Sequence, residues 1–388
     1  MISVSEALDQ LFALAAPLPV ETVPLVRAAG RILAQPVTAR RDQPPFPASA
    51  MDGYAVPDAA PGQRFTVIGE SAAGARFEGS VGPGQAVRIF TGAPVPEGAT
   101  RIVIQEDVTR DGETITLDDD LDDNPYIRPA GTDFRIGQTV EAPRLLTPQD
   151  VALLAAMNIA EVPVTRKPRV ALISTGDELV MPGDTPGPDQ IIASNTFGLH
   201  ALLHDLGAEP RILPIARDTT ESLIHGFSLV EDADLVVTIG GASVGDHDLV
   251  ARVAGELGME RAFHKVAMRP GKPLMSGRLS DAMMVGLPGN PVSAMICGHV
   301  FLAPVIRAML GLGTAPTPRL KARLSAPLSA NGPREHYMRA HLDGDGIRAL
   351  DRQDSSLLSV LGKANALLVR PVGDAARQIG DTVDYLPL

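Results

Sequence analysis

Short apolar runs alternate with helical stretches between residues 169 and 312. The apolar runs are VALIS, RILPIA, LVVTIG and MMVGL, and the helical stretches begin near Asn195, Thr219, Asp246 and Pro291. Apolar strands separated by helices are typical of a parallel sheet whose crossover helices cover its faces. The pattern therefore predicts a Rossmann-like α/β domain over residues 169–312.

Two further helices are expected outside this domain. The run SVSEALDQLFALAA has Ser3 and Glu6 at capping-box spacing, and LTPQDVALLAAMNIA has Thr147 as N-cap with Pro148 in the first turn. We expect both helices in one discontinuous helical N-terminal domain, made of residues 1–44 and 141–168.

The remaining segments are β-prone. Residues 45–140 contain short runs such as RFTVIG and RIVIQEDV, broken at short intervals by Gly and Pro, which indicates a small β domain inserted into the helical one. Residues 313–388 are proline-rich and β-prone, which indicates a C-terminal β domain. The expected fold class is therefore α/β multidomain.

Composition excludes several classes of protein. No apolar run reaches the 18 residues of a membrane span, and the N-terminus lacks a signal-peptide pattern, so we expect a cytoplasmic protein with no membrane contact. Cys297 is the single cysteine, which excludes an internal disulfide framework. A net charge of -12 argues against a nucleic-acid partner.

Polar clusters follow four of the predicted α/β strands. These clusters are TGDEL, RD, GGASVGDHD and PGNPVS. Because the carboxyl ends of parallel strands form the ligand crevice of an open sheet, the four loops should meet in one place.

Two of these loops suit an anion. The run IGGASVGD offers glycines and exposed amides ahead of a helix, which favours an anion cradle, although a tight turn alone explains it equally well. In LPGNPVS, capping by Asn290 with Pro291 in the first turn accounts for both residues without a ligand.

A third feature is a group of cations in FHKVAMRPGKPL. Read as an extended strand, it places Lys265 and Arg269 on one face about 13 Å apart, with Val266 and Met268 on the other. This pair could span a diphosphate, and Lys272 adds a third cation. The alternative is a solvated basic edge strand.

Several carboxylates fall in the same expected crevice: Asp177, Glu178, Asp218, Asp246 and Asp248. Crowded carboxylates favour a hard cation, and magnesium binds through one or two of them together with substrate phosphate oxygens. Helix capping is the alternative for Asp218 and Asp246. Asp52, in SAMDGYAV, raises a similar choice, because a turn aspartate beside Gly53 can accept a hydrogen bond from its own backbone.

Seven motifs in this order resemble the molybdopterin molybdenumtransferase (MoeA) family, which is also similar to the E domain of gephyrin. They are SAMDGYAV, VRIFTGAPVPEGA, IVIQE, STGDELV, GGASVGDHD, KVAMRPGKPL and GLPGNPVSAM. The resemblance runs from about residue 3 to the C-terminus. It implies an α/β domain of molybdopterin-binding type and a reaction in which adenylylated molybdopterin and molybdate give molybdenum cofactor and AMP, with Mg²⁺ as cofactor.

The resemblance also assigns residues. The catalytic acids it implies are Asp52, Asp133, Glu178, Asp218 and Asp248, of which Glu178, Asp218 and Asp248 would hold the metal. The substrate or phosphate contacts it implies are Thr91, Gly241, Ser243, Gly245, Lys265, Arg269, Lys272, Asn290 and Ser293. The looser C-terminal match adds Arg334, Arg339, Ser355 and Ser356 as substrate contacts.

For assembly, the resemblance implies a homodimer with shared sites, in which Asp52 reaches the crevice of a second subunit. A molybdopterin adenylyltransferase would be a possible partner. Two other functions stay open: a molybdopterin adenylyltransferase, since the α/β domain alone resembles that fold, and a non-catalytic scaffold similar to gephyrin.

Overall fold

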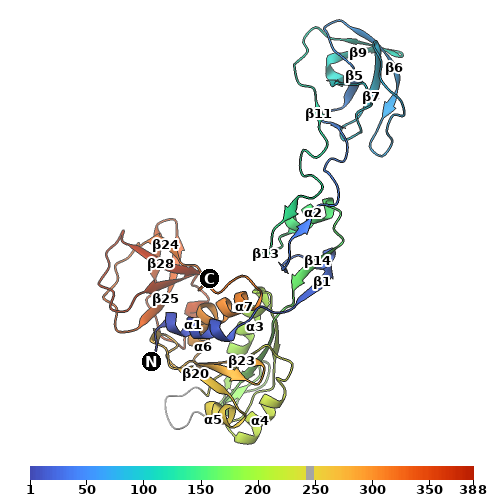
Figure 1. Ribbon diagram of the computed structural model, residues 1–388. Helices are drawn as coiled ribbons and strands as arrows, with labels where there is room; N and C mark the ends of the chain where they lie inside the picture. Colours follow the sequence, from blue (N-terminus) through green and yellow to red (C-terminus); the bar gives the residue numbers. More distant parts are fainter. Residues whose placement is uncertain (242–248) are drawn as a thin grey trace. The chain divides into compact units, whose positions relative to one another are not determined.

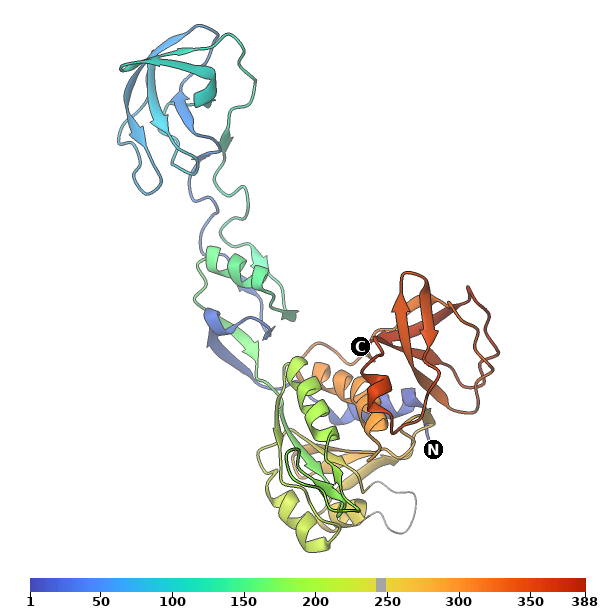
Figure 2. The same cartoon turned by 180° about the vertical axis from the view of Figure 1, so that it is seen from behind.

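The computed structural model describes residues 1–241 and 249–388, and it divides the chain into two units (Figure 1). The first unit consists of Met1–Glu21 and Thr165–Leu388, and the second unit is Thr22–Val164. Figure 2 shows the chain from behind. Four residues singled out from the sequence lie outside the described residues: Ser243, Gly245, Asp246 and Asp248.

A six-stranded sheet forms the centre of the first unit, in the order β18-β15-β19-β23-β22-β20. Its strands are β15 (Arg169–Ser174), β18 (Glu209–Ile212), β19 (Leu235–Ile239), β20 (Glu260–His264), β22 (Met275–Leu279) and β23 (Ala282–Leu287). The four strands predicted from the apolar runs are parallel, whereas β22 and β20 pair antiparallel. The α/β fold is thus confirmed, with an antiparallel edge that the sequence pattern did not indicate.

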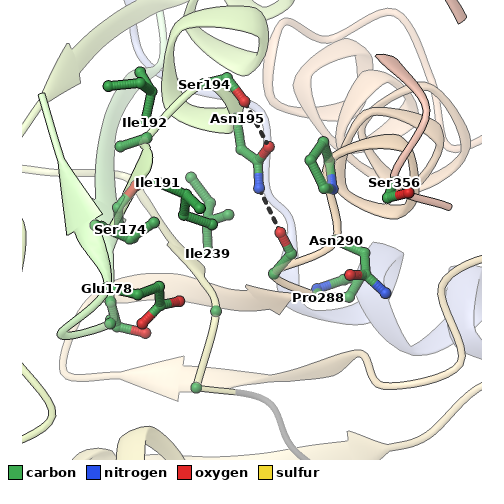
Figure 3. A pocket seen from close by; sticks show the side chains of 18 of the residues that line it. Ser174, Glu178, Ile191, Ile192, Ser194, Asn195, Ile239, Pro288, Asn290 and Ser356 are labelled. Carbon is green, nitrogen blue, oxygen red and sulfur yellow. Dashed lines mark hydrogen bonds between the residues drawn. The ribbon is translucent and has the colours of Figure 1, made fainter. Parts of the chain in front are cut away.

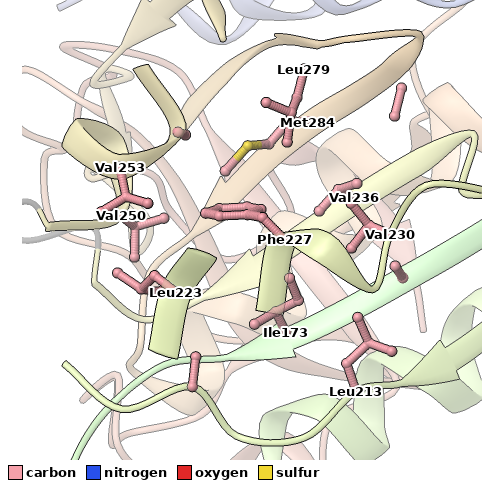
Figure 4. Packing of buried hydrophobic residues seen from close by; sticks show 14 of the residues in the cluster. Ile173, Leu213, Leu223, Phe227, Val230, Val236, Val250, Val253, Leu279 and Met284 are labelled. Carbon is pink, nitrogen blue, oxygen red and sulfur yellow. The ribbon is translucent and has the colours of Figure 1, made fainter. Parts of the chain in front are cut away.

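Helices pack against this sheet. They are α3 (Asn195–Asp205), α4 (Thr220–Ser228), α5 (Leu249–Glu256) and α6 (Pro291–Cys297). In one cluster, Phe227 of α4 and Val253 of α5 share a core with Ile173 of β15 and Met284 of β23 (Figure 4). The helices α3 and α6 contact each other. In addition, α3 contacts β15 and α6 contacts β23.

The order of the strands fixes the position of a crevice. From β15 the chain crosses through α3 to the edge strand β18, and then through α4 to β19 on the other side of β15. The loops that leave the carboxyl ends of strands β15 and β19 therefore run in opposite directions and leave a crevice between them. Open α/β sheets bind ligands in a crevice of this kind. A short parallel pair, β16 (Leu179–Val180) with β17 (Ile191–Ile192), continues from the loop after β15.

A long apolar helical segment continues from α6 through η3 (Gly298–Leu302) into α7 (Ala303–Met309). Among the described residues, Pro291–Met309 is the one helix long and apolar enough to cross a membrane. However, 83% of its apolar window is buried inside the protein. Its composition is therefore explained by core packing.

The N-terminal helix α1 (Val4–Leu14) begins with the predicted capping box of Ser3 and Glu6. Ala7 and Leu11 are fully buried, and the helix contacts α7, β20 and β22. It therefore lies in the first unit, whereas α2 (Pro148–Ala156), expected in the same domain, lies in the second unit.

The second unit contains α2 beside a four-stranded sheet, although we expected this part of the chain to be helical. The sheet has the order β1-β14-β2-β13, and η1 (Leu25–Arg27) follows β1. Its strands are β1 (Val20–Pro24), β2 (Ile32–Leu33), β13 (Arg144–Leu145) and β14 (Glu161–Thr165). Strands of two to five residues are too short to give a visible alternation, which explains why the pattern missed them.

The inserted β-prone segment forms a six-stranded sheet in the order β8-β5-β7-β6-β10-β9. Its elements are β5 (Gly53–Val56), β6 (Arg64–Ser71), β7 (Gln85–Ile89), β8 (Arg101–Ile104), η2 (Gln105–Asp107), β9 (Val108–Asp111) and β10 (Thr114–Leu117). Two small ladders flank it: β4 (Ala48–Ser49) with β11 (Ile127–Arg128), and β3 (Val37–Thr38) with β12 (Thr139–Val140). The exact domain boundaries stay a prediction.

The C-terminal sheet has the order β21-β25-β27-β28-β24, with β26 paired to β25. Its elements are β21 (Met268–Arg269), β24 (Leu320–Arg323), β25 (Glu335–Asp343), β26 (Gly346–Ala349), α8 (Leu358–Leu361), β27 (Ala366–Arg370) and β28 (Thr382–Pro387). The strand β21 comes from the α/β segment and joins this sheet by pairing in parallel with β25.

Candidate active site

The loops after β15, β18, β19 and β23 meet in a pocket of about 640 Å³ (Figure 3). Its lining from these loops includes Thr175, Gly176, Glu178, Asp218, Gly240, Gly241, Pro288, Gly289 and Asn290. Ile191, Ile192, Asn195 and Ser356 add to the wall. The convergence expected from strand order is therefore present in the fold.

Glu178 and Asp218 both line this pocket. Gly176 adopts a φ of +149°, a backbone conformation that favours glycine, and a Cβ there would lie 2.5 Å from the Glu178 Oε2 atom and displace this carboxylate. Partial burial raises the pKa of Asp218, and the charges of Asp177 and Glu178 raise it further. The two carboxylates are thus close enough to repel each other.

Asp218 does not cap a helix. The N-cap of α4 is Thr219, whose side chain accepts a hydrogen bond from the Ser222 amide, and the Asp218 amide donates to Asp177 Oδ1 at 3.2 Å. The capping interpretation of Asp218 is therefore wrong. Its carboxylate remains open to a ligand in the pocket.

The chemistry of this acid pair fits a divalent cation. Two crowded carboxylates, one with a raised pKa, are stabilised by a positive charge placed between them and a phosphate. Across residues 1–241 and 249–388, no group of three His, Cys, Asp or Glu side chains could hold a metal ion. The third predicted metal ligand, Asp248, lies outside these residues.

The start of the glycine-rich loop lies against Thr175. Gly240 and Gly241 have φ values of +98° and +65°, and a Cβ on Gly240 would lie 2.6 Å from the Thr175 carbonyl oxygen. Thr175 is 3% exposed, and its hydroxyl oxygen has no hydrogen-bond partner among the described residues. Both glycines are therefore required by the backbone conformation and by close packing at the pocket floor.

Asn290 occupies the N-cap position of α6, but its side chain makes no capping hydrogen bond. Instead its Nδ2 atom donates to Ser355 Oγ at 3.1 Å. The capping interpretation is thus wrong for this side chain, which joins the pocket to a C-terminal loop. Ser293 is 4% exposed and is not among the residues that line the pocket.

The segment around Lys265 and Arg269 is not one extended strand. Lys265 follows β20 with a φ of 79°, and after it the chain leaves the α/β sheet and enters the C-terminal sheet at β21. The prediction of a continuous strand with two cations about 13 Å apart is therefore wrong. The apolar residues that we expected on the other face, Val266 and Met268, are nevertheless fully buried. Lys272 lies beyond β21.

Cations gather around His336 on β25. Burial and the positive charges of Arg269, Arg339, Arg334 and Arg370 together lower the pKa of His336 to about 4, with burial as the largest cause. The sequence contained no periodic signal for this cluster, because its members come from three strands and a loop.

Arg339 is fully buried, and two of its donors are unused. Its Nη2 atom donates to the carbonyl oxygens of Arg352 and Asp354, at 2.9 and 3.1 Å. Its Nε and Nη1 atoms have no hydrogen-bond partner within the described part of the chain. Buried donors of this kind are rare in proteins unless a ligand or water completes them. Arg339 is therefore suited to an anion.

In the second unit, Asp52 is held by Thr91. The Thr91 amide and hydroxyl both donate to Asp52 Oδ1 at 2.7 Å. These two hydrogen bonds lower the pKa of Asp52, and the positive charge of Arg88 acts in the same direction. The alternative of a turn aspartate bonded to its own backbone is therefore wrong, and both donors of Thr91 are used by Asp52.

Asp133 lies elsewhere in the second unit. It lines an open groove of about 700 Å³ together with Arg41, Phe46 and Arg128. Asp52 is not among the residues that line this groove. Of the predicted acids, the structure therefore places the four described ones at three locations: the pocket, the Thr91 turn and this groove.

Successive parts of the chain match three family descriptions. Residues 2–158 match the MoeA N-terminal region (domain I and II), residues 171–308 a probable molybdopterin binding domain, and residues 321–388 the MoeA C-terminal region (domain IV).

Curated relatives and solved structures agree with these matches. The chain is 36% identical to a molybdopterin molybdenumtransferase of Nostoc sp., over 95% of this chain and 88% of the relative. It is 35% identical to that of Haemophilus influenzae, over 99% and 96%. Its fold is similar to the solved molybdopterin biosynthesis MoeA protein of Pyrococcus horikosii, with a TM-score of 0.85 and 30% identity over 100% of this chain and 99% of that chain. The chain therefore belongs to the molybdopterin molybdenumtransferase (MoeA) family, as its motifs predict.

Proposed function

We propose that this protein is a molybdopterin molybdenumtransferase, which inserts molybdenum from molybdate into adenylylated molybdopterin and releases AMP. Membership of the family supports a transferase of molybdenum cofactor biosynthesis. The observation that carries the finer proposal is the pocket that Glu178 and Asp218 line together with the backbone of Gly240 and Gly241. A phosphoanhydride substrate needs both kinds of group.

Glu178 and Asp218 are proposed to hold Mg²⁺, with Asp248 as the third acid. When bound, the cation would neutralise the phosphates during cleavage of the anhydride. The protein's own contribution is to hold the two carboxylates close together, in a pocket whose glycines let the substrate approach the backbone. The proposed phosphate contacts are Gly241, Ser243, Gly245, Lys265, Arg269, Lys272, Asn290 and Ser293.

Molybdate is a substrate in this proposal, and the buried Arg339 is proposed to contact it. The unused Nε and Nη1 donors support this assignment, because a tetrahedral oxyanion accepts charge-assisted hydrogen bonds. Arg269 and Arg334 add positive charge beside it. Ser356 lines the pocket, and Ser355 accepts a hydrogen bond from Asn290, so this loop adjoins the pocket that holds Glu178 and Asp218.

The assembly proposed is a cytoplasmic homodimer with shared sites. Asp52, Thr91 and Asp133 belong to the second unit and Glu178 to the first, so a homodimer could bring Asp52 of one subunit to the pocket of the other. A molybdopterin adenylyltransferase remains a possible partner that supplies the substrate.

The decisive experiment is an assay of AMP release from adenylylated molybdopterin. Purified protein should release AMP when molybdate and Mg²⁺ are both present, and chelation of Mg²⁺ should abolish release. Adenylylated pterin formed from molybdopterin, ATP and Mg²⁺ would instead identify an adenylyltransferase. A folded protein that does neither would be a scaffold.

A further inference from the structure

Arg88, on strand β7 of the second unit, lies over two aromatic rings. Its guanidinium carbon lies 5.0 Å from the ring centre of Tyr54 and 5.0 Å from that of Phe90. A planar guanidinium stacks on aromatic faces in a way that an ammonium does not. The two rings therefore fix the plane of this side chain.

The donors of Arg88 bind two residues next to Asp52. One is Gly53, which follows it in the chain, and the other is Gln105, which contacts it from another segment. Nη1 donates to the Gly53 carbonyl oxygen at 3.2 Å, and Nη2 donates to Gln105 Oε1 at 2.5 Å. The Gln105 amide in turn donates to the Asp52 carbonyl oxygen at 3.1 Å. The Arg88 side chain thus connects Gly53, which follows Asp52 in the chain, with Gln105, whose backbone N–H donates to the Asp52 carbonyl oxygen.

The same strand leads to the partner of the Asp52 carboxylate. Thr91 lies three residues after Arg88, and both of its donors bind Asp52 Oδ1. Among the described residues, both hydrogen bonds to the Asp52 carboxylate go to Oδ1, and Oδ2 accepts none. The neighbouring charges are Arg88 and Glu106, which accepts a hydrogen bond from Gln105 Nε2.

We propose that Arg88 is a positioning residue for Asp52: it fixes Gly53 and Gln105 so that the carboxylate keeps its bonds to Thr91 and presents Oδ2 to the substrate. This inference rests on the proposed function, because it assumes that Asp52 acts in the reaction. Arg88 itself does not touch the reacting atoms.

Three variants of the full-length chain test the proposal. Arg88→Met removes the charge and the donors but keeps an apolar stem, whereas Arg88→Lys keeps the charge without the planar fork. Arg110→Met is the matched control, because Arg110 is an exposed arginine on β9 of the same sheet, bonded to the Gly112 carbonyl oxygen.

The first measurement is the Thr91 amide signal of protein labelled with ¹⁵N-threonine, followed as pH falls. In the wild type this signal should titrate with the Asp52 carboxyl, and Asp52→Asn should abolish the titration. In Arg88→Met the midpoint should rise toward the ordinary aspartate range, with Arg88→Lys intermediate and Arg110→Met unchanged. An unchanged Thr91 titration in folded Arg88→Met would overturn the proposal.

The second measurement is AMP release. A carboxylate that acts mainly in the transition state affects kcat more than substrate binding. Its misplacement in Arg88→Met should therefore lower kcat roughly 10- to 100-fold with little change in KM. Wild-type kcat in Arg88→Met, beside an inactive Asp52→Asn, would overturn the positioning role. Full activity in Asp52→Asn would instead refute the proposed function of Asp52, while the Thr91 titration still reports whether Arg88 holds it. If Arg88→Met melts early, Gln105→Leu, which keeps Arg88 but removes the acceptor of Nη2 together with the donor to Glu106, provides the same comparison.

Discussion

The environment of Asp218 disfavours the ionised form of its carboxyl group. Its pKa is raised by partial burial and by Asp177 and Glu178, so the folded protein binds the Asp218 proton more tightly than the unfolded chain does. The protonated Asp218 carboxyl therefore stabilises the folded state at low pH. This stabilisation is lost as the pH rises through the raised pKa that Asp218 has in the folded protein. At neutral pH its charge opposes folding.

Asp218→Asn should consequently melt at a higher temperature than the wild type at neutral pH without Mg²⁺. Added Mg²⁺ should raise the Tm of the wild type and have much less effect on the variant, because the cation relieves the repulsion only where it exists. The exposed Asp205→Asn serves as a control. A lower Tm for Asp218→Asn, measured by calorimetry without metal, would contradict the assigned cause of the pKa shift.

Glu178→Gln should abolish most of the reaction while leaving the fold intact. The change keeps the shape beside Gly176 but removes the negative charge proposed to hold Mg²⁺. The single-turnover rate of AMP release should fall on the order of 100-fold or more. Binding of adenylylated molybdopterin should fall much less, since the phosphate contacts proposed above are cations and amides on other loops. A near wild-type rate across a Mg²⁺ titration would remove Glu178 from the metal site.

Single residues differ in how far the sequence could assign them. Glu178 and Asp218 follow strands directly, so strand order alone placed them in one pocket. Asp52 could not be assigned from its neighbours, because its partner Thr91 is 39 residues away. The unused donors of Arg339 left no trace in the sequence either, since burial of an arginine depends on the tertiary structure around it.

At the scale of elements, a buried ion pair fixes the segment that follows β27. Arg370 Nε donates to Asp374 Oδ2 at 2.6 Å, with side-chain exposures of 3% and 8%, and Arg377 binds the other carboxylate oxygen. The hydrogen bonds from Arg377 and Arg370 lower the pKa of Asp374. Its contribution to stability is therefore complete above the ordinary aspartate pKa and is lost as pH falls through the lowered value.

Asp374→Ala should destabilise the protein by about 3–5 kcal/mol, because it leaves the charge of Arg370 buried without its partner. Asp343→Ala is the control, since Asp343 pairs with Arg348 at the surface, where ion pairs contribute little to stability, and this variant should lose much less. Urea unfolding at pH 7 measures both. The difference between wild type and Asp374→Ala should shrink under strongly acidic conditions, and equal losses in the two variants would contradict a buried pair.

Elements were predictable where their pattern was long and local. The four parallel strands and the capped helices α1 and α2 follow from apolar runs and from Ser3 and Thr147. The change of sheet after Lys265 was not predictable, because it depends on pairing between β21 and β25, which are far apart in the sequence. The position of α1 is similar, since its partners β20, β22 and α7 follow it by more than 200 residues.

At the scale of the whole molecule, the proposed acids are divided between two units. Glu178 and Asp218 lie in the first unit, whereas Asp52 and Asp133 lie in the second. If one site needs acids from both units, and a closed homodimer supplies them from different chains, then each dimer has two equivalent shared sites. This arrangement can be tested without a structure of the dimer, because it determines which mixtures of inactive chains regain activity.

Asp52→Ala and Glu178→Ala should each be inactive alone, but a mixture allowed to exchange subunits should regain activity. In a mixed dimer one site receives the intact Glu178 of one chain and the intact Asp52 of the other, while the second site receives both substitutions. Random pairing of equal amounts makes half of the dimers mixed, so activity should reach about one quarter of the wild type. The mixture of Glu178→Ala with Asp218→Asn is the control, because both residues belong to the same unit of the chain and mixing leaves no intact site. Exchange is verified with a differently tagged chain, and AMP release is then measured. Verified exchange with no recovery in the first mixture would show that each site is built from one chain.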